Sequence, residues 1–161
     1  MRRPYAPAML SIGQKAPDFT LPATDGTPFH LAEQRGRHLV LFFYPKDNTP
    51  GCTAEVCSFR DQYADFLALG ADVVGISSDS AQSHHKFTQK HSLPFPLLAD
   101  VDGEVRQRYE VPRALLGLLP GRVTFLIDKK GVIQYIFNSL SGATDHVSKT
   151  KEMLGKLVVN G

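Results

Sequence analysis

The sequence predicts a mixed α/β fold in which helices flank a central sheet, and three observations support this prediction. A chain of 161 residues, 42% of them hydrophobic, has the size of one domain with its own core. Short β-rich apolar runs alternate with helical patterns, which is typical of parallel strands joined by crossover helices. A last pair of β-rich runs encloses a tight turn and predicts antiparallel strands at one edge. We therefore expect a single domain over residues 1–161.

The N-terminal part predicts a cover followed by a central strand. Residues 1–10 are expected to be a poorly ordered extension. Apolar pieces around 19–21 and 29–31, separated by glycine and proline, predict a β-hairpin or extended cover. The continuous β-rich run from His38 to Tyr44, apolar from Leu39 onward, predicts a strand buried on both faces of the sheet.

A helix is predicted from Cys52 to Leu69, with Gly70 placed to end it. Its apolar residues fall within a stripe about 100° wide, which is typical of a helix that packs on a sheet. The stripe consists of Val56, Phe59, Tyr63, Phe66 and Leu67.

The remaining elements complete the alternation. After the helix we expect a strand at 73–77, a helix from a cap at 78–80 to about His91, and a short strand or extended piece at 95–99. A short helix at 103–109, strands at 122–128 and 132–138, and a last helix from Thr144 or Asp145 to about Val158 follow. The apolar face of that helix is formed by Val147, Leu154, Leu157 and Val158. This order is compatible with a thioredoxin-type fold.

Composition excludes several classes of protein. The net charge of +2 and ordinary apolar content exclude intrinsic disorder, and two cysteines cannot form a four-cysteine zinc site. Basic residues are scattered, so no nucleic-acid partner is expected. No apolar run approaches the ~20 residues of a membrane-spanning helix, and the N-terminus lacks the apolar region of a signal peptide. We expect a cytoplasmic protein, or a plastid one if a transit peptide has been removed.

Cys52 lies at the start of the predicted helix, where a reactive thiol is favoured. In Thr49-Pro50-Gly51-Cys52, threonine is a good N-cap and proline suits the first helical position. Unpaired N–H groups at a helix start favour thiolate over thiol, whereas a free cysteine is only about 3% ionised at pH 7. The alternative is that Cys52 is simply a core residue, because it lies in line with the apolar stripe.

Cys57 is the only other thiol, and its spacing is informative. Five residues of ideal helix separate the two Cα atoms by about 8.6 Å, beyond the span of a disulfide. Either the two cysteines never bond, or the first turn and a half of the helix must unwind. Metal binding is a weaker option, because none of the six histidines has ligand spacing to the cysteines; His84 and His91 alone could share a helix face.

Two sequence blocks carry a family resemblance. Pro45-x3-Thr49-x2-Cys52, extended to Cys57-x-Phe59-Arg60-Asp61, resembles the active-site motif of the peroxiredoxins, in particular the peroxiredoxin Q or bacterioferritin comigratory protein branch. The segments 111–122 and 125–131 are most similar to plant-plastid and cyanobacterial members. The resemblance extends from about Gly13 to Leu157, nearly the whole chain.

This resemblance implies a function and a role for each site residue. Cys52 would be the peroxidatic nucleophile, which becomes a sulfenic acid, and Cys57 the resolving cysteine that closes a disulfide with it. Thr49 would hold the peroxide and Arg122 would stabilise the thiolate and the transition state. Pro45 would shield the thiolate, and the backbone N–H groups of Gly51 and Cys52 would assist.

The implied activity is a thioredoxin-dependent peroxidase acting on hydrogen peroxide and alkyl hydroperoxides. Thioredoxin or a similar dithiol would be the reductant, and no metal, haem or flavin cofactor is implied; members of the branch are often monomers, which we also expect here. The apolar loop 115–119 is expected to pack, or to edge the substrate pocket or a contact surface. The alternative functions are a redox sensor that uses the same disulfide switch, and a structural domain with inert thiols.

Overall fold

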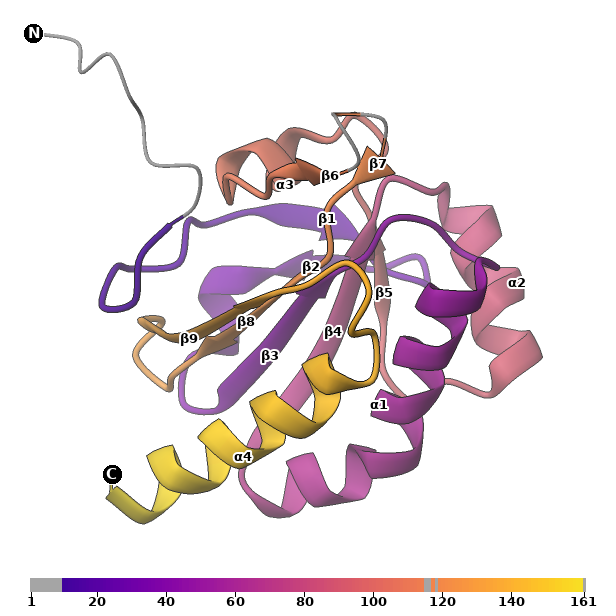
Figure 1. Ribbon diagram of the computed structural model, residues 1–161. Helices are drawn as coiled ribbons and strands as arrows, with labels where there is room; N and C mark the ends of the chain where they lie inside the picture. The colour runs from indigo at the N-terminus through magenta and orange to yellow at the C-terminus, as the bar shows by residue number, and fades with distance from the viewer. Residues whose placement is uncertain (1–9, 115–116, 118, 161) are drawn as a thin grey trace, which may run out of the picture.

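A five-stranded sheet forms the centre of the protein (Figure 1), whose computed structural model describes residues 10–114, 117 and 119–160. The strand order is β5-β4-β3-β8-β9. The bounds are His38–Phe43 for β3, Ala71–Ser77 for β4, Leu97–Ala99 for β5, Val123–Ile127 for β8 and Ile133–Asn138 for β9. β3, β4 and β5 are parallel, and β8 and β9 run antiparallel. The predicted mixed sheet is confirmed.

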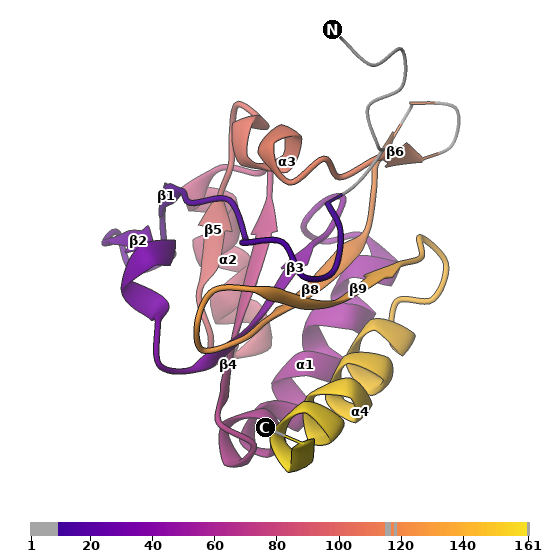
Figure 2. The same ribbon diagram turned by 90° about the vertical axis from the view of Figure 1, so that its left-hand side faces the viewer.

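Helices cover one face of this sheet. α1 (Pro50–Ala68), α2 (Ala81–His91) and α4 (Asp145–Asn160) contribute to a single core cluster with that face. The other face is covered by α3 (Glu104–Arg108) and by the N-terminal segment, which lies across the sheet from α1 and α4 (Figure 2). That segment contains the predicted hairpin, β1 (Thr20–Pro22) and β2 (Pro28–His30), followed by the 3-10 helix Leu31–Gln34.

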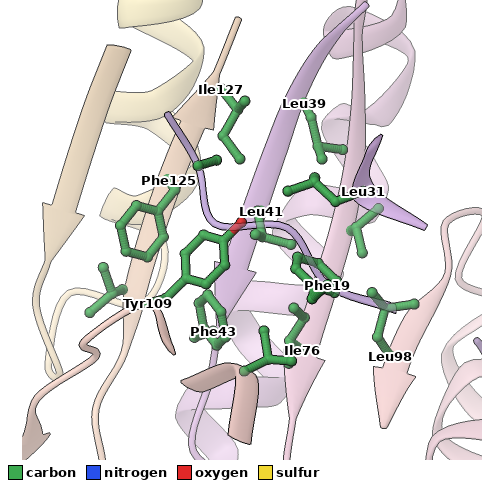
Figure 3. Packing of buried hydrophobic residues seen from close by; sticks show 14 of the residues in the cluster. Phe19, Leu31, Leu39, Leu41, Phe43, Ile76, Leu98, Tyr109, Phe125 and Ile127 are labelled. Atoms are coloured by element: carbon green, nitrogen blue, oxygen red, sulfur yellow. The ribbon is translucent and has the colours of Figure 1, made fainter. Parts of the chain in front are cut away.

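β3 is buried on both faces, as its unbroken apolar run predicts. Leu41 and Phe43 point into the cluster under the N-terminal segment (Figure 3), whereas Val40 and Phe42 point toward the helices. Phe42 stacks on Phe59 of α1, with ring centroids 4.5 Å apart. Because side chains alternate along a strand, β3 packs into the core clusters on both faces of the sheet.

Two apolar residues lie outside the faces predicted for them. Leu67 is 41% exposed and Val158 is 39% exposed. Leu67 is one residue past the buried Phe66, a rotation of about 100° that takes it off the face of α1. Val158 lies in the last turn of α4, where Val159 is also exposed.

The short strands β6 (Arg113–Ala114) and β7 (Leu119–Pro120) form an antiparallel pair that was not predicted, because two residues carry no periodic signal. Most of the apolar loop 115–119 lies outside the described residues, as does the expected extension up to residue 9. Leu10 packs, partly buried, against the cluster under the N-terminal segment. Among the described helices, none has the length and apolar character needed to cross a membrane.

Candidate active site

A cavity of about 460 Å³ opens where β3 gives way to α1. The sheet register explains its composition, because Phe43 at the end of β3 pairs with Val123 at the start of β8. The loop before α1 and the residue before β8 are therefore neighbours. The cavity is lined by five of the six predicted site residues, Pro45, Thr49, Gly51, Cys52 and Arg122.

Cys52 lies in the first turn of α1 and is only 1% exposed. Thr49 occupies the N-cap position, and its carbonyl accepts a hydrogen bond from the Thr53 N–H. The Thr49 hydroxyl does not cap the helix; it donates to the Lys46 carbonyl, 2.9 Å away. The helix start therefore keeps N–H groups that no side chain of the cap residue satisfies, beside the thiol.

The Arg122 guanidinium donates to the Cys52 thiol and is held there by two further hydrogen bonds. Its Nη2 donates to the Cys52 Sγ at 3.4 Å, and its Nη1 donates to Glu55 Oε1 at 2.6 Å. Its Nε donates to the Leu140 carbonyl at 3.1 Å. Arg122 therefore presents a fixed positive charge and a hydrogen-bond donor to the buried sulfur.

Gly51 allows this close approach. A Cβ at Gly51 would lie 3.1 Å from Arg122 Nη2, a tight contact that would require the guanidinium to shift by a few tenths of an ångström. A glycine at this position therefore leaves room for the guanidinium that donates to Cys52.

Glu55 is a buried partner of Arg122 that the sequence analysis missed. Burial raises the pKa of Glu55 to about 8, although Arg122 opposes the shift. Its Oε2 has no hydrogen-bond partner and lies 3.6 Å from His146 Nδ1. Glu55 comes three residues after Cys52 on α1, so the two share a helix face. An acidic residue on a buried stripe was the signal available in the sequence.

His146 completes the buried polar group below Arg122. Its Nε2 donates to the Ser139 carbonyl at 2.7 Å, which leaves Nδ1 to accept from the Thr124 hydroxyl at 2.8 Å. Burial lowers the pKa of His146 to about 4, so the ring is neutral at physiological pH. Because the Thr124 hydroxyl takes the lone pair of Nδ1, Glu55 Oε2 is left without a hydrogen-bond partner 3.6 Å away.

Arg106 is a second buried cation that the sequence analysis missed. Its Nη2 donates to the Tyr44 carbonyl at 2.8 Å and its Nη1 to the Gly121 carbonyl at 2.9 Å. These carbonyls precede Pro45 and Arg122 respectively, so Arg106 ties together the two segments that form the cavity. Burial lowers the pKa of Arg106 to about 10, which leaves it charged.

The described residues contain one group with metal-type ligands, Asp47, Asp79 and His84, whose ligand atoms lie within 4.8 Å of one another. Hydrogen bonds already occupy these atoms. Asp47 accepts from the Tyr44 hydroxyl at 2.6 Å and lies 2.8 Å from His84 Nδ1, while His84 Nε2 is 3.1 Å from the Leu98 carbonyl. The group is therefore suited to brace the loop before α1 rather than to hold an ion.

Cys57 lies outside the cavity, half-buried, in the second turn of α1. α1 is continuous through both cysteines, and both thiols are free. This arrangement agrees with the spacing argument, because an intact helix does not allow the disulfide. The Cys57 Sγ is 3.6 Å from Nδ1 of His91, the last residue of α2.

A thiol held beside an arginine at a helix start, on a sheet of this topology, defines a thiol-dependent oxidoreductase of the thioredoxin-fold class. A family model described as AhpC/TSA family matches residues 12–136. The chain is 47% identical over 148 residues to a chloroplastic peroxiredoxin Q of Oryza sativa subsp. japonica, covering 92% of this chain and 68% of the relative. It is 44% identical over 150 residues to that of Sedum lineare, covering 93% and 81% respectively.

Solved structures of peroxiredoxins share the fold of this protein. A peroxidoxin of Mycobacterium tuberculosis, BcpB, superposes with a TM-score of 0.83 at 37% identity, covering 91% of this chain and 97% of that one. Xanthomonas campestris peroxiredoxin Q superposes with a TM-score of 0.79 at 31% identity, covering 87% and 91%. This protein therefore belongs to the AhpC/TSA family of peroxiredoxins, and the resemblance to the peroxiredoxin Q branch is confirmed. It is a thiol-dependent peroxidase.

Proposed function

We propose that Cys52 is the peroxidatic and Cys57 the resolving cysteine of a peroxidase for hydrogen peroxide and alkyl hydroperoxides. The observation that supports this most is the hydrogen bond from Arg122 to a buried Cys52 sulfur that lines a cavity. The O–O bond is broken by a thiolate, and the positive charge of Arg122 stabilises the negative charge that develops on the peroxide oxygens.

The first step transfers one oxygen atom. The Cys52 thiolate attacks the nearer peroxide oxygen, the O–O bond breaks, and the leaving alkoxide or hydroxide takes a proton to give an alcohol or water. Pro45 limits access of water to the resulting sulfenic acid, and the Thr49 hydroxyl positions the peroxide. The cavity is large enough for an alkyl group, and a structure of the Xanthomonas campestris relative is described in terms of alkyl peroxide reduction.

The second step closes and reopens a disulfide. The Cys57 sulfur attacks the Cys52 sulfenic sulfur and water leaves, after residues 52–57 have unwound. A thioredoxin-type dithiol then reduces the disulfide by thiol exchange.

The rice and Sedum relatives are named as chloroplastic, which favours a plastid location for this protein. No comparison supports the cytoplasmic location expected from the sequence.

An intact-mass experiment tests these assignments. One equivalent of peroxide should remove 2 Da from the wild type, for an intramolecular disulfide, and thioredoxin with its reductase should restore the mass. Cys52→Ser should abolish turnover. Cys57→Ser should still oxidise at Cys52 but lose recycling, or pass to a disulfide-linked dimer. Turnover that survives Cys52→Ser contradicts the proposal, and a single oxidation without recycling indicates a sensor instead.

A further inference from the structure

His91 faces the thiol that the proposed function makes the resolving one. Its Nδ1 lies 3.6 Å from the Cys57 Sγ, within the range of a hydrogen bond to sulfur. His91 ends α2 and Cys57 lies on α1, so two separate helices bring the pair together. The His91 ring also packs edge-on against Phe87, at 5.0 Å between centroids, which fixes its orientation.

The charged groups around the pair favour a neutral imidazole. Burial, followed by the charges of Lys90 and Arg60, lowers the pKa of His91. Lys90 belongs to α2 and Arg60 to α1, where Arg60 is itself paired with Asp61 at 3.0 Å. A neutral Nδ1 that faces a thiol is a hydrogen-bond acceptor, and the S–H group is the donor that it can accept from.

The contact is held in place just beyond Cys57. Arg60 Nη1 donates to the backbone carbonyl of His91 at 2.8 Å, and Phe59 is fully buried against Phe42. These interactions tie α1 to α2 and to the sheet directly after Cys57. If these contacts persist when the first turns of α1 unwind, Cys52 would move toward a Cys57 that stays beside His91.

We propose that His91 is the general base of the resolving step, which rests on the proposed function of Cys57. His91 Nδ1 takes the S–H proton as the Cys57 sulfur attacks the sulfenic sulfur of Cys52. The S–S bond forms, the S–O bond breaks, and the departing hydroxide takes up the proton that His91 has accepted, directly or through water, to leave as water. Two electrons pass from the Cys57 sulfur to the sulfenic sulfur, so no further oxidant or reductant is needed. The positive charge of Arg60, which interacts with Cys57, stabilises the developing thiolate.

The expected magnitude follows from thiol ionisation. A thiol without a base is only about 3% ionised at pH 7, so losing the base slows attack by up to about 30-fold there. The deficit should shrink as the pH rises, because the hydroxide concentration increases tenfold per pH unit and hydroxide replaces the missing base. A purely structural role of His91 would give the same deficit at every pH.

The test is a single-turnover, rapid-quench mass measurement at pH 6.5 to 9.5 on the wild type, His91→Gln and the control His85→Gln. His85 is exposed on the same helix, so the control should resolve like the wild type. In His91→Gln, the Cys52 sulfenic acid, trapped by dimedone, should accumulate at pH 7 and disappear at pH 9.5.

Two results would overturn the inference alone: disulfide formation in His91→Gln at the wild-type rate at pH 7, or a deficit that does not change with pH. A wild type that consumes peroxide without ever forming the Cys52–Cys57 disulfide would instead overturn the proposed role of Cys57, and the inference with it. The two failures are therefore distinguishable.

Discussion

Replacing Glu55 by glutamine should stabilise the protein in alkaline solution and change little in acid. The pKa of Glu55 is raised from 4.5 to about 8 by burial, so the folded state binds more protons than the unfolded state between these two values. In the wild type, this group therefore lowers the free energy of unfolding as the pH rises from 4.5 to 8. Glutamine keeps an oxygen for the Arg122 bond but does not ionise.

The size of this stability difference follows from the shift of the Glu55 pKa from 4.5 to about 8. One proton corresponds to about 1.4 kcal/mol per pH unit, so about 3.5 units give an upper bound near 5 kcal/mol. The pKa of about 8 already includes the opposing effect of Arg122. The buried amide NH2 of glutamine has no acceptor at the Oε2 position and offsets part of the gain, so the expected gain for Glu55→Gln at pH 9 is about 2–4 kcal/mol. At pH 5 the two proteins should differ by less than about 1 kcal/mol.

Urea unfolding of the reduced proteins at pH 5, 7 and 9 measures this difference. Glu33→Gln, at an exposed glutamate, is the control and should show a small difference that does not vary with pH. A Glu55→Gln variant that is less stable than the wild type at pH 9 would refute the reasoning. That result would mean that Glu55 is an ionised partner of Arg122 throughout, with its pKa lowered rather than raised.

Three further variants test the frame of the site. Gly51→Ala should push the Arg122 guanidinium away from the thiol and slow the peroxide step at least tenfold, with unfolding free energy unchanged or higher; stopped-flow peroxide consumption that stays at the wild-type rate contradicts this. Arg106→Met should leave two buried carbonyls without donors, at a cost of about 2–4 kcal/mol in urea unfolding, and should lower kcat/KM; an unchanged midpoint counts against it. Asp47→Asn should remove a carboxylate whose pKa burial raises but whose hydrogen bonds, that to His84 first, lower below its usual value. The contribution of the ionised Asp47 carboxylate to the free energy of unfolding is present above pH 4 and is lost as the pH falls through the lowered pKa. Asp47→Asn should therefore match the stability of the wild type only in strong acid.

The sequence alone predicted the elements better than the environment of the site. β3 and α1 follow from an apolar run and an apolar stripe, which are local patterns. The position of Cys52 at a helix start follows from the Thr49-Pro50-Gly51 lead-in. The approach of Arg122, 70 residues further along the chain, came only through the family resemblance, since it depends on how β8 pairs with β3.

Buried ionisable side chains were the main omission. Glu55, Arg106 and His146 look like surface residues in a sequence, because such side chains are rarely buried without a partner. Their burial depends on partners from distant elements, such as the Gly121 carbonyl for Arg106. His91 was singled out only as a weak candidate for metal binding, because its neighbour Cys57 lies on a different helix, 34 residues away.

The burial of Val56 has a consequence for recognition. Val56 lies between the two cysteines in the chain, within the segment that must unwind before they can bond, and in the reduced protein it is fully buried. Disulfide formation would therefore carry an apolar side chain from the core to the surface, close to the new bond. A reductant that contacts the exposed Val56 side chain would distinguish the disulfide form of the enzyme from the reduced form. The reductant would release the enzyme once the helix rewinds.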